Sequence, residues 1–308
     1  MEIISGALDF WLEKNTAVAI GKFDGIHIGH RRLIKELLSQ KDKGLLACVF
    51  TFDPPPAVLF GQADGGELTT KEEKRRIFEE LGIDILIEFP LTRESAAIEP
   101  ETFVEEILVG RMRTKYIAAG ADLSFGAGGR GNAGLLCGLS ERYGFAVETI
   151  DKVCVRGEEV SSTCIRALLE EGNMETAAEY LGIPYRMTGK VVHGKRIGHT
   201  LGFPTVNLVP EAEKLLPPFG VYFTKIWYKG RAYDGVSNIG CKPTVTEKRI
   251  IGVETYLYDF SEEIYGEEIT VFFHAYRRPE RRFESLEALA AQLQEDMAAG
   301  EKYWESKI

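Results

Sequence analysis

The chain has 308 residues, of which 44% are hydrophobic, enough for two domains with cores of their own. Its formal net charge of -10 at pH 7 argues against general binding to nucleic acid or to an anionic membrane, because both require a basic face. A cytoplasmic protein is expected, because the five cysteines form no CxxC pair, no apolar signal segment begins the chain, and no apolar run reaches the roughly 18 residues of a membrane helix.

Residues 1–180 alternate short apolar runs with segments of helical periodicity. Strands are expected over residues 16–21, 45–52, 84–89, 116–120 and 146–153. Helices are expected over residues 31–44, 71–82, 101–110 and 132–144. Apolar strands that alternate with helices of this length predict a parallel α/β sheet with helices on both faces. Ligands of such sheets bind beyond the carboxyl ends of the strands, in turns such as the one after the first of these strands.

From about Tyr185 onward the segments are short and strand-like, with glycine and proline between them. Further strands are expected over residues 185–193, 220–228, 232–240, 252–258 and 269–276, and a closing helix over 285–304 with Ser285 as its N-cap. Short strands at regular spacing predict an antiparallel barrel or sandwich. The expected domains are therefore residues 1–183 and 184–308.

The stretch GKFDGIHIGH joins a predicted strand to a predicted helix through a glycine-rich turn. Gly21 and Gly25 allow a tight turn, and Gly29 leaves no side chain between His27 and His30. The first N–H groups of a helix are unpaired, and imidazoles beside them can donate hydrogen bonds to phosphate oxygens. There are two alternatives. Either histidine can have a merely structural role, or the two can bind a metal, although no further ligand lies nearby in the sequence. We interpret the combination as a phosphate-binding site.

This stretch resembles the signature of nucleotidylyltransferases, and its F-D-G-x-H-x-G-H form is similar to that of the bacterial bifunctional riboflavin kinase/FMN adenylyltransferase (FAD synthetase) family. Three further segments agree in order: TFDPPP at 51–56, GADLSFGAGGRGN at 120–132 and VSSTCIR at 160–166. The resemblance implies an α/β Rossmann-like nucleotidylyltransferase domain. Such a domain transfers AMP from ATP to FMN and releases FAD and pyrophosphate.

The resemblance also implies site residues in this half, with His27 and His30 as catalytic residues. Those expected at ATP are Gly21, Phe23, Asp24, Gly25, His27, Gly29, His30, Ser161, Ser162, Thr163 and Arg166. Those expected on the FMN side are Pro54, Pro56, Asp122, Phe125 and Arg130. The planar guanidinium of Arg166 suits triphosphate oxygens, and the ring of Phe125 can cover an aromatic ligand. Pro55 and Leu123 depart from the family pattern, which bears on the acceptor more than on ATP.

In the second half, GKVVHGKRIGHTLGFPTVNL resembles the riboflavin kinase signature, and GVSNIGCKPTV and VETYLYDF agree with it in order. The resemblance implies an antiparallel β-barrel riboflavin kinase domain with a C-terminal helix. Thr205 and Asn207 point the same way along a strand, and their oxygens suit Mg²⁺. A strand glutamate is usually a solvated edge residue, but in this context Glu254 is expected to be the general base toward a ribityl hydroxyl.

The expected ATP contacts of this half are Gly189, Val191, Gly194, Lys195, Gly198, Gly202, Pro204, Thr205 and Asn207. Those expected at riboflavin are Glu254, Arg277 and Phe283, and those at the metal are Thr205 and Asn207. The implied partners are ATP with Mg²⁺, riboflavin, FMN and FAD, without nucleic acid or membrane, and the oligomeric state stays open.

Two other functions stay open on the residues alone. The first half can be a nucleotidylyltransferase for another acceptor, such as a phosphorylated alcohol, which predicts pyrophosphate release that does not depend on FMN. The chain can also be a flavin- or nucleotide-binding regulator without catalysis, which predicts tight binding without turnover.

Overall fold

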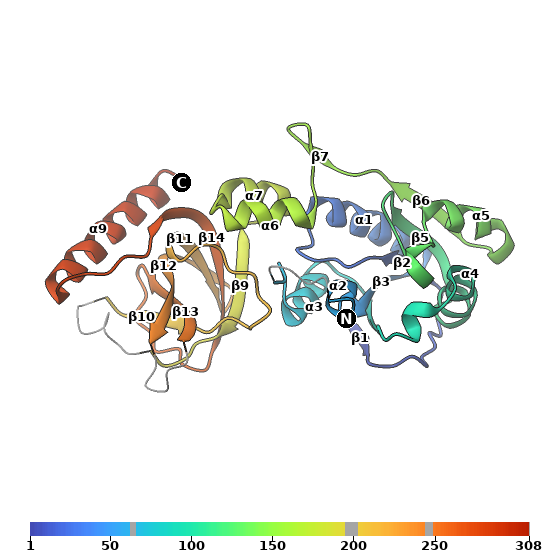
Figure 1. The fold of residues 1–308 in the computed structure, drawn as a ribbon, viewed down its shortest axis with the longest axis horizontal. Coiled ribbons are helices and arrows are strands. Elements are labelled where there is room, and N and C mark those ends of the chain that lie inside the picture. The colour runs from blue at the N-terminus through green and yellow to red at the C-terminus, as the bar shows by residue number, and fades with distance from the viewer. Residues whose placement is uncertain (62–65, 195–202, 244–248, 308) are drawn as a thin grey trace. The chain divides into compact units, whose positions relative to one another are not determined.

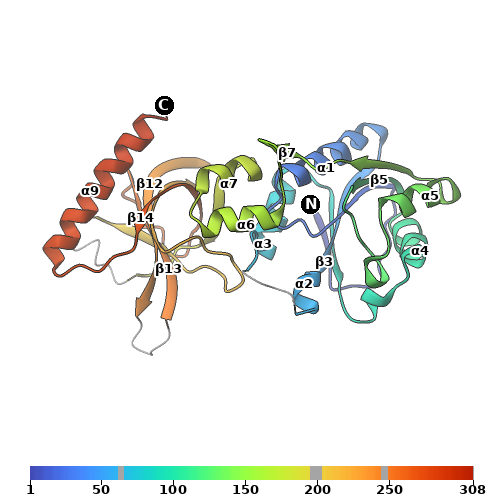
Figure 2. The ribbon, with the colours of Figure 1, turned by 45° about the horizontal axis from the view of Figure 1, so that its top comes forward.

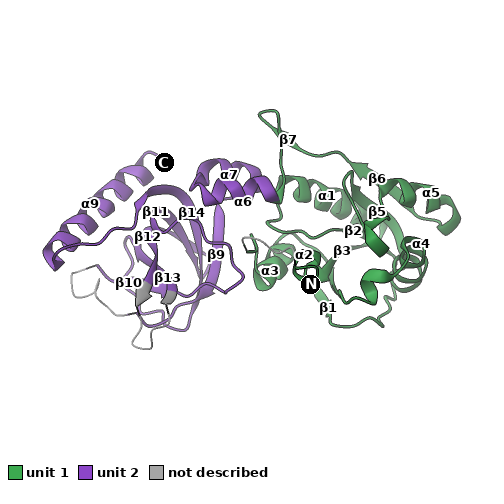
Figure 3. Cartoon of the chain, in the orientation of Figure 1, with its two compact units in different colours: residues 1–162 green, residues 163–308 purple. Residues whose placement is uncertain are grey.

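The computed structural model describes residues 1–61, 66–194, 203–243 and 249–307. It divides into two compact units, residues 1–162 and 163–308 (Figure 3). Helix α7 (Met174–Leu181) therefore belongs to the second unit, as does helix α6 (Ser162–Glu170) from Thr163 onward. The domain boundary expected after residue 183 stays a prediction.

The first unit contains a parallel sheet of six strands in the order β1-β4-β3-β2-β5-β6 (Figure 1). Its strands are β1 (Glu2–Ser5), β2 (Thr16–Ile20), β3 (Leu46–Asp53), β4 (Ile85–Pro90), β5 (Thr114–Gly120) and β6 (Ala146–Ile150). The expected parallel sheet is confirmed. Strand β1 was not predicted, because its four residues are mostly exposed and give no apolar run.

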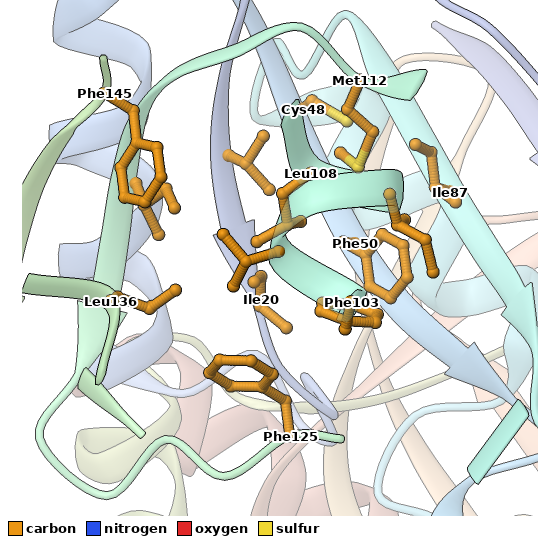
Figure 4. Close-up of a cluster of buried hydrophobic side chains, with 14 of the residues drawn as sticks. Ile20, Cys48, Phe50, Ile87, Phe103, Leu108, Met112, Phe125, Leu136 and Phe145 are labelled. Carbon is orange, nitrogen blue, oxygen red and sulfur yellow. The ribbon is translucent and has the colours of Figure 1, made fainter. Parts of the chain in front are cut away.

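Helices cover both faces of this sheet, as expected (Figures 1 and 2). One face packs against α1 (Ile28–Ser39) and α3 (Lys71–Glu80), and the other against η3 (Phe103–Arg111) and α5 (Ala133–Tyr143). The second of these cores is rich in phenylalanine, with Phe50, Phe103 and Phe125 within one cluster (Figure 4). Burial of this apolar surface is the main force that holds the layers together.

Short elements complete the first unit. They are η1 (Gln40–Lys43), α2 (Pro56–Leu59), η2 (Ser95–Ala97), α4 (Pro100–Thr102), η4 (Ala127–Gly129), β7 (Cys154–Val155) and β8 (Glu158–Glu159). The helix predicted over 101–110 is α4 followed by η3, a π-helix in which the amide of Met112 donates to the carbonyl of Ile107. Hydrophobic spacing does not distinguish this wider helix from an α-helix.

The second unit contains an antiparallel sheet of six strands in the order β10-β13-β12-β11-β14-β9. Its strands are β9 (Tyr185–Lys190), β10 (Thr205–Leu208), β11 (Gly220–Tyr228), β12 (Arg231–Pro243), β13 (Arg249–Leu257) and β14 (Glu268–Pro279). Beyond β9, the amide of Val192 donates to the carbonyl of Asn207 in β10, so a bridge links the two edges of the sheet. The expected antiparallel barrel architecture is confirmed.

Helix α9 (Leu286–Glu305) follows this sheet, and the hydroxyl of Ser285 caps it by accepting from the amide of Ala288. Its residue Trp304 packs with Val221 and Val236 on one face of the sheet. The opposite face carries a fully buried chain of hydroxyls, which joins Thr224, Ser237 and Thr255 at 2.8 and 2.7 Å. In the described part of the chain, no helix is long and apolar enough to cross a membrane.

Candidate active sites

The H-x-G-H turn connects the end of β2 to the start of α1. Phe23 and Ile26 have φ angles of 49° and 42°, in a left-handed region that bulky side chains rarely adopt. Both side chains are fully buried, so packing holds the backbone in this conformation. Gly25, with φ of 80°, takes a similar conformation without a side chain.

The two histidines lie against each other at the start of α1. Nδ1 of His27, the N-cap residue, accepts a hydrogen bond from the amide of His30 at 3.4 Å. The rings stack with centroids 3.8 Å apart. A Cβ atom at Gly29 would lie 3.1 Å from two atoms of the His27 ring, so glycine lets this ring fold back over the helix start.

Both imidazoles are neutral near pH 7. Burial lowers the pKa of His27 to about 4, although the charge of Asp122 opposes this. Burial lowers the pKa of His30 well below its ordinary value, and the charges of His27 and Lys74 add to this effect. Because Nδ1 of His27 accepts a hydrogen bond, its proton is assigned to Nε2, which can donate to a ligand. Nδ1 of His30 is buried and has no hydrogen-bond partner among the described residues.

Contacts from two distant segments hold the turn in place. The amide of Gly25 donates to the hydroxyl of Thr69 at 3.1 Å, and the amide of Thr69 donates to the carboxylate of Asp24 at 3.2 Å. The hydroxyl of Ser162 donates to the carbonyl of Asp24 at 2.8 Å. Thr69 was missed in the sequence, where the only signal was the capping pair that follows it, Thr70 and Glu73.

The residues expected on the acceptor side are not all together. Asp122 is 71% exposed, and its charge reaches His27. Phe125 is only 3% exposed and packs on Phe103 with ring centroids 5.4 Å apart. This is a core position that supports the loop, and the expected flavin contact of Phe125 stays a prediction. Arg130 is paired with both carboxylate oxygens of Glu99 at 2.7 and 2.8 Å.

Pro54 and Pro56 follow β3, and Pro56 begins α2. Next to them, Asp53 is 2.5 Å from the ammonium of Lys71 on α3. The same ammonium is 3.3 Å from Glu88, which Arg75 also contacts with two hydrogen bonds of 2.8 and 2.7 Å. Burial raises the pKa of Glu88, but the Arg75 hydrogen bonds and the nearby cations outweigh it, so the pKa is lowered. This ion cluster ties the proline loop to α3.

The S-S-T-x-I-R segment spans the division between the units. Ser161 and Ser162 belong to the first unit, whereas Thr163 and Arg166 lie on α6 in the second. The expected position of Arg166 beside the histidines therefore stays a prediction.

The second unit contains a cavity of about 250 Å³ between the sheet and α9. Glu254 and Thr205 line it from the strands, and Leu293 and Met297 line it from the helix. The hydroxyl of Thr205 donates to the carboxylate of Glu254 at 2.8 Å. The structure thus brings together two side chains expected at this site.

Asn207 lies opposite Glu254 in the pairing of β10 with β13 and is 6% exposed. A Cβ atom at Gly194 would lie 2.4 Å from its amide nitrogen, so a side chain at that position would displace the Asn207 amide from where it lies. Gly189 and Val191 belong to the chain on either side of the end of β9, and Pro204 is exposed just before β10. Lys195, Gly198 and Gly202 lie outside the described residues.

Of the residues expected at riboflavin, Glu254 and Phe283 line the cavity and Arg277 does not, and their contact with the flavin stays a prediction. Arg277 is exposed, whereas the next residue, Arg278, lines the cavity, because a register shift between β14 and β11 at this point interrupts the regular alternation of side chains. Arg278 donates to both carboxylate oxygens of Asp296 on α9, at 2.5 to 3.1 Å. Asp296 is only 1% exposed. Both residues were missed, and the sequence signal for them was an aspartate on the apolar stripe of the last helix.

Comparisons with known proteins agree on both halves. The FAD synthetase family model matches residues 10–164, and the riboflavin kinase family model matches residues 181–304. A relative from Listeria monocytogenes is 36% identical over 291 residues, which cover 94% of this chain and 92% of the relative. Relatives from Escherichia coli K12 and Bacillus subtilis are 35% and 32% identical, over 95% of this chain and 94% and 93% of their own.

All three relatives are described as bifunctional riboflavin kinase/FMN adenylyltransferases. A crystal structure described as a macrolide-efflux protein from Streptococcus pneumoniae superimposes with a TM-score of 0.84 at 27% identity. The match covers 97% of this chain and 98% of that one, and it supports the same two-part fold.

Proposed function

The chain belongs to the bifunctional riboflavin kinase/FMN adenylyltransferase family, and from this premise we propose how its residues divide the two reactions. It is a bifunctional enzyme of flavin cofactor synthesis. The first unit transfers AMP from ATP to FMN, and the second phosphorylates riboflavin with ATP. The observation that carries this division is that the neutral His27–His30 pair and the Thr205–Glu254 pair lie in separate units.

In the second unit, Glu254 accepts the proton of a ribityl hydroxyl as its oxygen forms a bond to the γ-phosphorus of ATP. The bond from that phosphorus to the bridging oxygen breaks, and ADP leaves with the electron pair. Thr205 fixes the orientation of the carboxylate through its 2.8 Å hydrogen bond. The apolar wall of Phe283, Leu293 and Met297 suits the flavin ring system.

The oxygen atoms at this site fit Mg²⁺. The hydroxyl proton of Thr205 is directed at Glu254, so the lone pairs of its oxygen remain for a cation. Asn207, two residues along the same strand, adds an amide oxygen. When bound, Mg²⁺ neutralises charge on the phosphates. Thr205 and Asn207 are the residues that we propose hold it.

In the first unit, a phosphate oxygen of FMN attacks the α-phosphorus of ATP, and pyrophosphate leaves. No covalent enzyme intermediate is required, because positioning and charge stabilisation provide the catalysis. His27 donates from Nε2 to a phosphate oxygen, and His30 lies beside it at the unpaired amides of α1. Arg166 is proposed to bind the leaving pyrophosphate.

Substrates and products are accordingly ATP, riboflavin, FMN and FAD. We further infer a cytoplasmic location without a nucleic acid or membrane partner, which the net charge of -10 supports.

The test is a time course of flavins separated by chromatography, with riboflavin, ATP and Mg²⁺ as reactants. Wild type yields FMN and then FAD, His30→Ala stops at FMN, and Glu254→Ala forms FAD only from supplied FMN. If either variant lost both steps alike, the proposed division of labour would be wrong. Pyrophosphate release without FMN would instead favour another acceptor.

A further inference from the structure

Lys74 on α3 is a lysine that neither the motifs nor the proposed mechanism uses. It is only 7% exposed. Lys74 lies four residues before Phe78, so the two side chains share one face of the helix. Phe78 packs edge-on against Phe23 with ring centroids 5.5 Å apart, and Phe23 lies 5.1 Å from the ring of His30. This face of α3 is therefore turned toward the H-x-G-H turn.

Two neighbouring cations on α3 are paired with carboxylates. Lys71 contacts Asp53 and Glu88, and Arg75 contacts Glu88 with two hydrogen bonds. Among the residues that the structure describes, none makes a hydrogen bond or ion pair with the ammonium of Lys74. An ammonium without a partner in the protein is available to an anionic ligand.

The charge of Lys74 acts on the proposed phosphate site. Lys74 is close enough to His30 that its positive charge contributes to the lowered pKa of that imidazole. The histidines themselves are neutral, so they donate hydrogen bonds but bring no positive charge to a strongly anionic ligand. A site that holds a triphosphate also needs a cation to compensate its charge.

We infer that Lys74 binds the polyphosphate of ATP in the adenylyl-transfer site. The inference rests on the proposed function of the first unit. The ammonium completes a cradle with His27, His30 and the first amides of α1. An anion in this cradle pairs with an ammonium that makes no hydrogen bond or ion pair with the residues that the structure describes.

The test measures the KM values for ATP in FAD synthesis and for pyrophosphate in its reversal, where FAD and pyrophosphate give FMN and ATP. Lys74→Met keeps the aliphatic stem and removes the charge, and Lys74→Arg keeps the charge. Lys115→Met is the matched control, because Lys115 is an exposed lysine on β5 in the same unit. Riboflavin phosphorylation by the same chains reports that the second unit is intact.

Lys74→Met is expected to raise both KM values by about tenfold to a hundredfold, the range for a lost hydrogen bond to a charged group. Lys74→Arg should raise both KM values clearly less than Lys74→Met does, and Lys115→Met should have the KM values of wild type. Normal KM values in Lys74→Met would overturn the inference. So would equal increases of the KM values in Lys74→Met and Lys74→Arg. If Lys74→Met does not fold, Lys74→Gln gives the same comparison. A wild type that neither makes nor cleaves FAD would overturn the proposed function instead.

Discussion

The hydroxyl of Thr205 donates a 2.8 Å hydrogen bond to the carboxylate of Glu254, from strand β10 to strand β13. One proposed ligand of the metal is therefore in direct contact with the proposed base. A general base typically contributes a factor of about 10² to 10⁴ to the rate.

Glu254→Gln, which keeps the shape of the side chain, should lower the rate of riboflavin phosphorylation by that factor. Adenylylation of supplied FMN should be unchanged, because it occurs in the other unit. Chromatographic separation of the flavins measures both rates. Glu262→Gln, an exposed glutamate of the second unit, is the control and should behave as wild type. Normal kinase activity in Glu254→Gln would exclude the carboxylate as the base.

Gly29→Ala should slow adenylyl transfer and leave riboflavin phosphorylation unchanged. The added Cβ would lie 3.1 Å from the His27 ring, so the ring must shift away from its position over the helix start. Gly138→Ala is the matched change, because a Cβ there meets nothing within 4 Å and the residue lies within α5. It should raise the unfolding free energy by roughly 0.5–1 kcal/mol. Equal adenylylation rates in the two variants would show that the ring position does not matter.

The pH dependence of FAD synthesis should show no loss of kcat/KM for ATP near pH 6.5. Burial lowers the pKa of His27 to about 4 and that of His30 well below its usual range, so both imidazoles stay neutral as the pH falls through 6.5. Activity that needs these neutral groups is therefore present above that pH and is lost only as the pH approaches about 4. An acidic limb near 6.5 that disappears in His27→Asn would contradict this expectation.

Asp296→Asn should destabilise the second unit and raise the KM for riboflavin. The substitution leaves the guanidinium of Arg278 beside the cavity without its anionic partner, and breaking a buried ion pair costs about 3–5 kcal/mol. Denaturant unfolding, monitored through the kinase activity that remains, measures the loss of stability, and kinase rates at varied riboflavin concentration measure the KM. Asp234→Asn is the control, because the Lys225–Asp234 pair is more than one-third exposed on both sides. Its loss should cost no more than about 1 kcal/mol.

Much of this fold is predictable, because its strands, helices and turns follow from patterns of neighbouring residues in the sequence. The apolar runs before Gly21 and after Leu45 indicate parallel strands, and the glycines of the H-x-G-H stretch place a turn between a strand and a helix. Both expectations depend on residues that are neighbours in sequence.

The contacts that were missed join residues far apart in the chain. Thr69 bonds to Gly25 over 44 residues, and no local signal reveals that α3 begins beside this turn. The same placement brings Lys74 to His30. Arg277 was expected at the flavin, but Arg278 lines the cavity. The register of the strand decides which of these two adjacent arginines faces the helix, and the sequence does not reveal that register.

The left-handed conformations of Phe23 and Ile26 have a consequence for nucleotide affinity. Such conformations cost of order 1–3 kcal/mol each and persist only where the surroundings enforce them. The H-x-G-H turn, the proposed phosphate site, is thus held in shape by the core without a bound nucleotide. If it binds ATP as we propose, little chain entropy is lost on binding. We therefore expect residues outside the turn to influence the affinity for ATP. A smaller side chain at position 78 would remove the contact of Phe78 with Phe23, loosen the turn and weaken ATP binding.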